Sequence, residues 1–173
     1  MSAPGIEVFT GAGRGKTTAA LGVALRASGQ GLRVHIVFFM KGGSDYGEQK
    51  ILARLPNITT ARFGQSRLVN ARAVAPEDKE EAAQALAEAH RAALSDSYDL
   101  VILDEVNVAL AWGLIPLGGV LSLLREKPEE VELILTGRGA PREIIEAADL
   151  VTEMVEVKHP YSRGTPARRG LDY

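Results

Sequence analysis

The fold is decided by residues 10–18, which read Thr10-Gly11-Ala12-Gly13-Arg14-Gly15-Lys16-Thr17-Thr18. A β-prone run, Ile6–Phe9, precedes this stretch, and an alanine-rich segment with helical spacing follows it. Glycines in a turn between a strand and a helix bring backbone N–H groups close to phosphate oxygens, and the helix N-terminus favours anions. Lys16 adds positive charge, and the hydroxyl of Thr17 can ligate Mg²⁺. The stretch therefore predicts a phosphate-binding loop of the kind that holds ATP.

The glycine spacing departs from the usual phosphate-loop pattern, in which four residues separate a first glycine from Gly-Lys-Ser/Thr. Counted back from Gly15, that first position is Thr10, and the glycines stand at positions 11, 13 and 15 instead. A glycine-rich turn with a chance Gly-Lys-Thr is the alternative interpretation. The coincidence of strand, glycines, Lys-Thr-Thr and helix favours phosphate binding.

An acidic pair, Asp104-Glu105, directly follows the apolar run Leu100–Leu103. In phosphate-loop proteins, an acidic residue at the end of such a strand helps to hold Mg²⁺. Two solvated carboxylates that end a strand are the alternative. Beside a phosphate loop the pair is a candidate metal site, in which Glu105 could also serve as a general base.

Strand-like and helix-like segments alternate along the whole chain. Apolar β-prone runs cover residues 6–9, 33–40, 58–63, 100–103, 131–136 and 150–155. Helical patterns cover residues 16–28, 46–55, 76–94, 117–124 and 141–148, and a long loop is expected over residues 64–75. This order predicts an α/β fold with a mostly parallel central sheet and helices on both faces. Because no internal repeat or low-complexity linker is visible, residues 1–173 are expected to form one domain.

The composition narrows the class of protein. A formal net charge of -2 and a pI of about 6.0 argue against nucleic-acid binding, which is typical of basic chains. The absence of cysteine excludes disulfides, thiolate metal sites and cysteine nucleophiles. The longest apolar run near the N-terminus, Val34–Met40, is far shorter than the roughly 20 residues of a membrane helix. No targeting segment is recognisable, so we expect a cytoplasmic protein without membrane contact.

Several short motifs beyond the loop and the acidic pair stand in a distinctive order. They are Leu25-Arg26-Ala27, Phe38-Phe39-Met40-Lys41-Gly42, Leu103-Asp104-Glu105-Val106-Asn107, Thr136-Gly137-Arg138-Gly139, Val157-Lys158-His159-Pro160-Tyr161 and Ala167-Arg168-Arg169-Gly170-Leu171-Asp172-Tyr173. In this order and spacing, the chain closely resembles the phosphate-loop type of ATP:corrinoid adenosyltransferase from about Glu7 to Tyr173. The displaced glycine pattern is normal for that family. Each motif alone is weak, but the ordered set is specific.

The resemblance implies a three-layer RecA-like fold and transfer of the 5′-deoxyadenosyl group of ATP to cobalt. Co(I) of a reduced corrinoid would attack C5′ of the ribose and triphosphate would leave, so no protein nucleophile is expected. The resemblance further implies a corrinoid substrate (cobalamin, cobinamide or cobyrinic acid diamide), Mg²⁺ or Mn²⁺, a Co(II) reductase such as a flavoprotein, and a homodimer.

The resemblance also gives roles to residues of this chain. Lys16 and Arg138 would stabilise the leaving triphosphate, and the metal would be held by Thr17, Asp104 or Glu105. Contacts to ATP are expected from Thr10, Gly11, Ala12, Gly13, Arg14, Gly15, Lys16, Thr17, Thr18, Lys41 and Arg138. Lys41 follows a strand at the carboxyl edge, where open α/β sheets bind ligands, and a solvated lysine is the alternative. A basic tail could contact the corrinoid or lie in solvent; it comprises Lys158, Arg163, Arg168 and Arg169.

Two other classes of protein share such an ATP site. A phosphate-loop kinase or NTPase acting on small molecules would release ADP instead of triphosphate. A RecA-like ATPase that binds nucleic acid or a protein partner is disfavoured by the acidic pI and by an aromatic content of 5%, which leaves few stacking platforms for bases.

Overall fold

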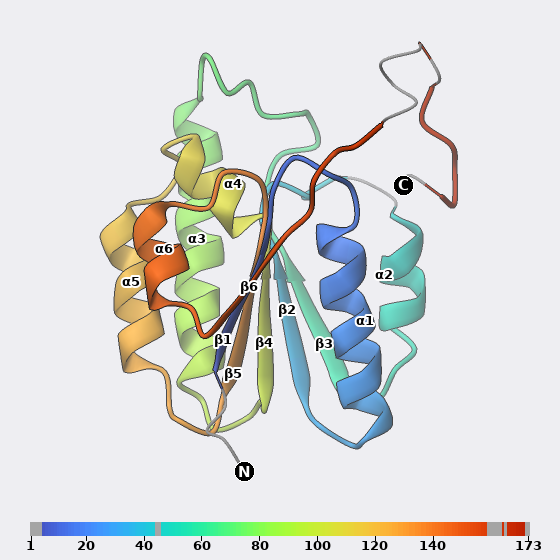
Figure 1. Ribbon diagram of the computed structural model, residues 1–173, viewed down its shortest axis with the longest axis vertical. Coiled ribbons are helices and arrows are strands. Elements are labelled where there is room, and N and C mark those ends of the chain that lie inside the picture. The colour runs from blue at the N-terminus through green and yellow to red at the C-terminus, as the bar shows by residue number, and fades with distance from the viewer. Residues whose placement is uncertain (1–4, 44–45, 159–163, 165, 172–173) are drawn as a thin grey trace.

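The computed structural model describes residues 5–43, 46–158, 164 and 166–171. A six-stranded sheet has the strand order β3-β2-β4-β5-β1-β6 (Figure 1). Its strands are β1 (Ile6–Thr10), β2 (Val34–Phe38), β3 (Ile58–Arg62), β4 (Leu100–Asp104), β5 (Glu132–Thr136) and β6 (Leu150–Glu153). All neighbouring strands in this sheet are parallel, so their carboxyl ends lie at one edge. The predicted parallel sheet is confirmed.

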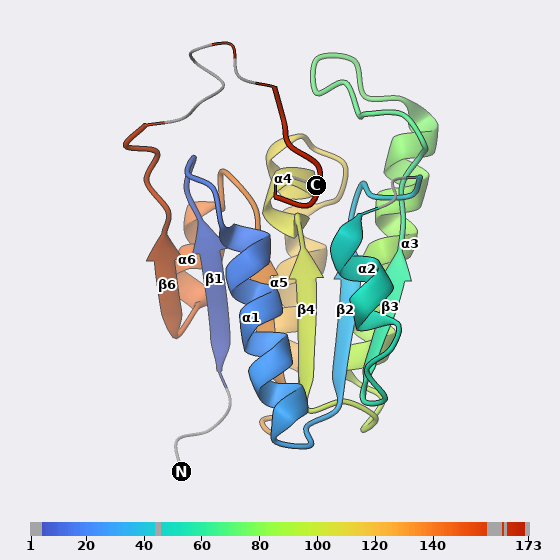
Figure 2. The same cartoon turned by 90° about the vertical axis from the view of Figure 1, so that its right-hand side faces the viewer.

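Helices cover both faces of the sheet (Figure 2). Two helices lie on one face, α1 (Lys16–Gly29) and α2 (Gly47–Leu52). Three lie on the other, α3 (Pro76–Ala93), α5 (Leu117–Glu126) and α6 (Arg142–Ala147). A short helix, α4 (Val106–Ala111), follows β4 at the carboxyl edge. This three-layer arrangement agrees with the predicted phosphate-loop α/β architecture.

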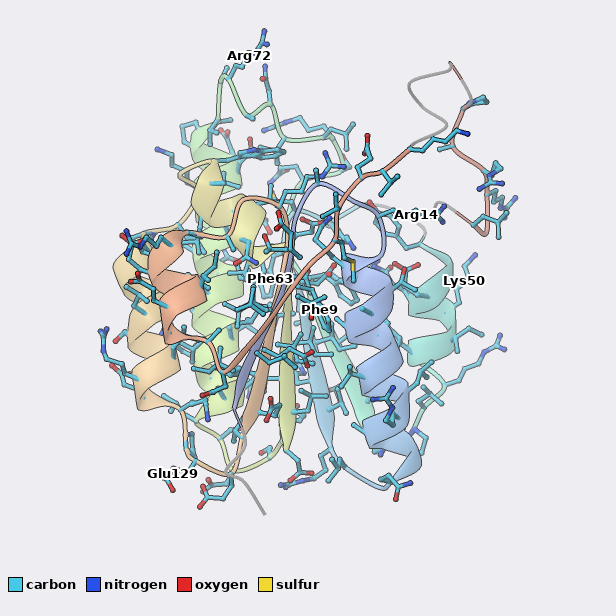
Figure 3. The ribbon with its side chains drawn as sticks, in the orientation of Figure 1. Phe9, Arg14, Lys50, Phe63, Arg72 and Glu129 are labelled. Carbon is cyan, nitrogen blue, oxygen red and sulfur yellow. The ribbon has the colours of Figure 1, made fainter. Side chains whose placement is uncertain are left out.

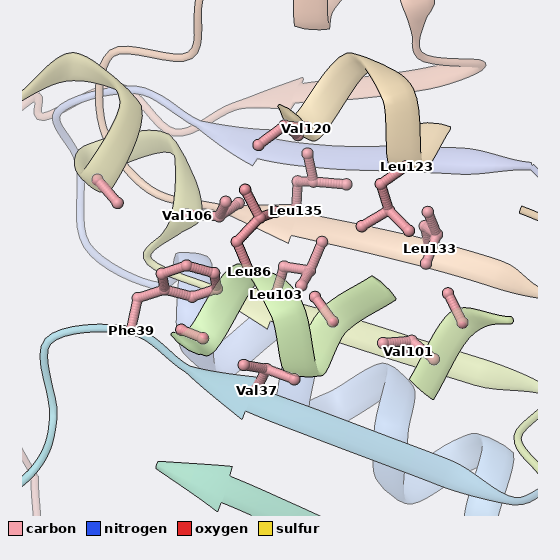
Figure 4. Packing of buried hydrophobic residues seen from close by; sticks show 14 of the residues in the cluster. Val37, Phe39, Leu86, Val101, Leu103, Val106, Val120, Leu123, Leu133 and Leu135 are labelled. Carbon is pink, nitrogen blue, oxygen red and sulfur yellow. The ribbon is translucent and has the colours of Figure 1, made fainter. Parts of the chain in front are cut away.

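Each central strand contributes to two cores, because successive side chains of a strand point to opposite faces. In β5, Leu133 and Leu135 belong to the core under α3 and α5, whereas Ile134 belongs to the core under α1. Figure 4 shows the first core, in which Leu86 of α3 and Leu123 of α5 lie over the leucines of the sheet. Strands buried on both faces explain the nearly continuous apolar runs in the sequence.

The sequence pattern does not predict α4. This helix has six residues, too few to show a helical period, and two of its first three are valines, which have low helix propensity. It begins after Glu105, whose φ of 66° lies in the left-handed region. Three predicted elements extend too far at their C-terminal ends. The structure ends β2 at Phe38, α2 at Leu52 and β6 at Glu153, whereas the sequence predicts ends at residues 40, 55 and 155.

Strand β6 is the edge of the sheet next to the phosphate loop. Among the strands of the described residues it pairs with β1 alone, and its four residues are exposed. In the described part of the chain, no helix combines the length and apolar character needed to cross a membrane.

His35 is a buried residue of β2 whose side chain lies against α3. The ring of His35 is 4.8 Å from that of Tyr98, and its Nδ1 is 2.7 Å from the Thr59 hydroxyl. Its Nε2 lies 2.9 Å from a carboxylate oxygen of Glu88. Burial lowers the pKa of His35 by more than the neighbouring Glu88 raises it. The fold therefore favours the neutral imidazole.

Candidate functional site

The predicted site residues meet at the carboxyl edge of the sheet. The phosphate loop follows β1, Lys41 follows β2, Asp104 ends β4, and Arg138 follows β5. These four strands are consecutive neighbours in the order β2-β4-β5-β1. Parallel pairing thus brings together residues that lie more than a hundred positions apart in sequence, at the edge where open α/β sheets bind ligands.

The phosphate loop encloses the ammonium group of Lys16. Its Nζ donates hydrogen bonds to the carbonyl oxygens of Gly11, at 2.8 Å, and Gly13, at 2.5 Å. Gly11 and Gly15 adopt φ values of 93° and 114°, which favour glycine, and α1 begins at Lys16. The loop therefore has the sharp turn into a helix N-terminus that the sequence predicts.

The charge of Lys16 is held in a setting that favours an anion nearby. Burial lowers the pKa of Lys16, and the positive charge of Arg138 lowers it further, while Glu105 acts in the opposite direction. The charge of Arg138 thus acts on Lys16 at this edge, and a bound polyphosphate would relieve the repulsion between the two cations. The roles of Lys16 and Arg138 toward a triphosphate stay predictions.

Thr10, which stands where the usual pattern has glycine, forms a side-chain hydrogen bond to a neighbouring turn. Its side chain is buried, and its hydroxyl accepts a hydrogen bond from the backbone N–H of Ala140 at 3.3 Å. In the same turn, the N–H of Gly137 donates to the carbonyl of Phe9 at 3.2 Å. These two bonds fix the Gly137-Arg138-Gly139 turn beside the phosphate loop.

Lys41 does not lie free at the edge of the sheet. Its Nζ is 2.6 Å from a carboxylate oxygen of Asp104, and the side chains are 12% and 1% exposed, respectively. The second Asp104 oxygen accepts a hydrogen bond from the Thr136 hydroxyl at 2.8 Å. Burial alone would lower the pKa of Lys41, but the charge of Asp104 and its hydrogen bond, with contributions from Glu105 and Tyr46, together outweigh burial and raise the pKa. Lys41 and Asp104 therefore form a buried ion pair.

Glu105 is the carboxylate next to this pair and is less enclosed. Its N–H donates to the Thr136 hydroxyl at 2.9 Å, which fixes the backbone where it turns into α4. Burial, and then the charge of Asp104, raise the pKa of Glu105, while Lys41, Lys16 and Arg138 lower it. A cation beside Glu105 would stabilise its charged form.

Oxygen donors for a metal are present, although they do not form a cluster. Within the residues that the structure describes, no group of three or more His, Cys, Asp or Glu side chains could hold a metal ion. Mg²⁺ takes few protein ligands and binds mainly phosphate and water oxygens, so a hydroxyl and one carboxylate suffice. Thr17 and Glu105 fit this requirement better than Asp104, since both Asp104 oxygens already have partners.

Comparison with known proteins identifies the family. The family described as ATP:corrinoid adenosyltransferase BtuR/CobO/CobP matches residues 3–173. Corrinoid adenosyltransferase of Escherichia coli (strain K12) is 38% identical over 168 residues, which cover 97% of this chain and 85% of that protein. Corrinoid adenosyltransferase CobA of Salmonella typhimurium (strain LT2) is 37% identical over 173 residues, with the same two coverages. The chain belongs to the ATP:corrinoid adenosyltransferase family. The predicted resemblance is thus confirmed, and the Pseudomonas aeruginosa corrinoid adenosyltransferase, 34% identical over 166 residues, agrees with it.

The remaining predicted residues of this adenosyltransferase-family chain are more exposed. Arg138 is exposed, as are Ala12, Arg14 and Thr18 of the loop. Arg14 points away from the loop and donates a hydrogen bond to the carbonyl of Leu171 (Figure 3). In the basic tail, Lys158, Arg168 and Arg169 are exposed, and Arg163 lies outside the described residues.

Two residues at the adenosyltransferase site were not predicted from the sequence. Thr136 joins Asp104 to Glu105, and its place as a polar residue at the end of a buried strand could have indicated it. Met154 packs on the phosphate loop, and the glycine spacing was the available signal for such a contact.

Proposed function

We propose that this protein transfers the 5′-deoxyadenosyl group of ATP to Co(I) of a reduced corrinoid. The observation that carries the proposal is the family match over residues 3–173, together with a phosphate loop at the carboxyl edge of the sheet. The cobalt donates an electron pair to C5′, the C5′–O bond breaks, and its electron pair leaves on triphosphate. Cobalt goes from Co(I) to Co(III), so no further oxidant is required.

The protein's contribution to this reaction is to position two substrates and to stabilise the leaving group. The nucleophile belongs to the corrinoid, so a Ser, Cys or His nucleophile is not needed. Backbone N–H groups of the loop and the charges of Lys16 and Arg138 would face the triphosphate, on which negative charge grows as the C5′–O bond breaks. The lowered pKa of Lys16 fits a site built to receive an anion.

We propose that Mg²⁺, or Mn²⁺ in its place, is held by the Thr17 hydroxyl and the Glu105 carboxylate. When bound, such an ion neutralises part of the triphosphate charge. Asp104 would not ligate the metal directly, since its two carboxylate oxygens already contact Lys41 and Thr136. Lys41 would then influence the site through Asp104, in place of the direct ATP contact expected from the sequence.

The partners are proposals that follow from the chemistry. The substrate would be cobalamin, cobinamide or cobyrinic acid diamide, and a Co(II) reductase such as a flavoprotein must supply the Co(I) state. ATP and a reductant are both available in a cytoplasm, so we propose that location. We also propose a homodimer, as the resemblance implies.

The decisive experiment is an anaerobic assay with ATP, Mg²⁺ and chemically reduced cobalamin or cobinamide. The corrinoid spectrum and the phosphate product are followed together, with Lys16→Ala as the matched control. Light-sensitive adenosylcorrinoid with one triphosphate per alkylated cobalt is the expected result. Release of ADP without cobalt alkylation would replace this proposal with the kinase or NTPase alternative.

A further inference from the structure

The three glycines of the phosphate loop share one neighbour, Met154. A Cβ atom built on Gly11 would lie 2.4 Å from the Met154 carbonyl oxygen, and one on Gly13 would lie 2.7 Å from the same atom. A Cβ on Gly15 would lie 3.3 Å from the Met154 sulfur. The glycines at 11 and 13, which the usual nucleotide-binding pattern does not require, therefore match a surface that receives the backbone of residue 154, and Gly15 lies beside its side chain.

Gly13 gives the clearest evidence for this contact. Its φ lies outside the left-handed region, so its backbone conformation alone would allow another residue. Close approach is the remaining reason for glycine, because an added Cβ would meet backbone atoms of Met154 and Val155 at 2.7–2.9 Å. The N–H of Gly13 also donates to the Met154 carbonyl at 2.6 Å. Backbone atoms cannot swing aside as the end of a flexible side chain can.

Both the backbone and the side chain of Met154 are held in place. Its N–H donates to the carbonyl of Thr10 at 2.9 Å, which extends the pairing of β6 with β1 by one residue. Its side chain is half-buried and packs against the core cluster that contains Phe9 and Ala20. The residue therefore connects the end of the edge strand, the start of the loop and the first turns of α1.

The chain contacts the loop again near its C-terminal end. Arg14, the exposed residue between Gly13 and Gly15, donates its hydrogen bond to the carbonyl of Leu171. Figure 1 shows the segment after β6 rising beside the loop that follows β1. Two separate positions downstream of β6 thus touch the loop.

We propose that Met154 is a positioning residue for ATP, which holds the phosphate loop in its binding conformation through Gly13 and Gly15. The proposal rests on the proposed function, since it presumes that ATP binds in this loop. Gly13 allows the close approach of residue 154 and donates its N–H to the Met154 carbonyl, while Gly15, whose φ of 114° itself favours glycine, lies beside the Met154 side chain. The N–H groups from Gly15 to Thr17 would then be the ones that face the phosphates of ATP.

The test measures ATP binding directly, by calorimetry at 25 °C, in three variants and the parent protein. Met154→Ala removes the side chain beside Gly15 and should raise the ATP Kd at least tenfold. Met154→Leu keeps the volume and should stay within threefold of the parent. Leu150→Ala is the matched control, because Leu150 is an exposed apolar residue of β6, the strand that ends directly before Met154, and it should leave the Kd unchanged. Urea unfolding of each variant shows that the binding data refer to folded protein.

Steady-state kinetics and NMR separate positioning from general stability. Met154→Ala should raise the KM for ATP with little change in the KM for the corrinoid. In isotope-labelled parent protein, ATP binding should give phosphorus couplings to amides among Gly15–Thr17 and none to Gly13. A Met154→Ala variant that is less stable but binds ATP like the parent would overturn the proposal, as would a phosphorus coupling to Gly13. Failure of the parent protein itself to bind ATP would instead refute the proposed function.

Discussion

Replacing Lys41 by methionine should destabilise the protein through Asp104. Methionine keeps an unbranched apolar stem beside Phe38 and Tyr46, whose ring centroids lie 5.2 Å and 5.1 Å from the Lys41 Nζ, and removes the ammonium group with its hydrogen bond to Asp104. Asp104 is 1% exposed and would keep a single hydrogen bond, from Thr136. The substitution thus leaves a buried carboxylate without its counter-ion.

Breaking a buried ion pair by removing one partner costs about 3–5 kcal/mol, because the remaining charge is uncompensated. The Thr136 hydrogen bond stays, so we expect the lower end, about 3 kcal/mol. For a chain of this size, a loss of 1 kcal/mol lowers the Tm by roughly 2–4 °C, which gives a decrease of roughly 6–12 °C. Unfolding by urea without ligand measures the loss directly.

Two further variants test the electrostatic explanation. Lys79→Met, at an exposed position of α3, is the matched control and should change the free energy of unfolding by less than about 0.5 kcal/mol. The double variant Lys41→Met/Asp104→Asn removes the orphaned charge and should recover most of the lost stability. A loss below about 1 kcal/mol in Lys41→Met, or no recovery in the double variant, would refute the reasoning.

Three more predictions concern the site and the pH dependence. Lys16→Ala should weaken ATP binding by at least about 2 kcal/mol, seen as a Kd more than about 30-fold higher, since a charge-assisted contact to phosphate is lost. Arg138→Ala should lower kcat by about 10-fold or more, while thermal unfolding stays within 2 °C or so of the parent, because the side chain is exposed. Because the pKa of His35 is lowered in the folded protein, the unfolded chain binds more protons once the pH falls below about 6.5, the ordinary pKa of histidine. The stabilising contribution is therefore present above that pH and is lost as pH falls through the folded pKa. His35→Gln should flatten this decrease between pH 7 and 5 in urea titrations, and an unchanged slope would contradict the assignment.

The sequence predicts the features that depend on local period and on strand order. Continuous apolar runs such as Leu100–Leu103 identify strands buried on both faces, and alternation with helices then requires parallel pairing. Parallel pairing in turn places Lys16, Asp104 and Arg138 at one edge, as observed. These conclusions need no knowledge of distant contacts.

The features that the sequence does not predict are tertiary contacts. No local pattern distinguishes a lysine that binds ATP from one that pairs with Asp104, because the choice depends on the register of β2 against β4, where Phe38 pairs with Asp104. The packing of Met154 on the loop likewise depends on β6 lying beside β1. The single domain over residues 1–173 stays a prediction.

The position of β1 in the sheet has a consequence for how the protein is made. β1 is the first strand to be synthesised, but it pairs with β5 and β6, the last two. Ile6, for example, has no pairing partner until Leu133 has been synthesised. Until residues beyond 136 have left the ribosome, the strand that carries the phosphate loop has no neighbour in the sheet. The nucleotide site is therefore completed only at the end of folding, and nascent chains should not be retained by immobilised ATP. A ligand that binds only the finished fold then stabilises the product and none of its precursors.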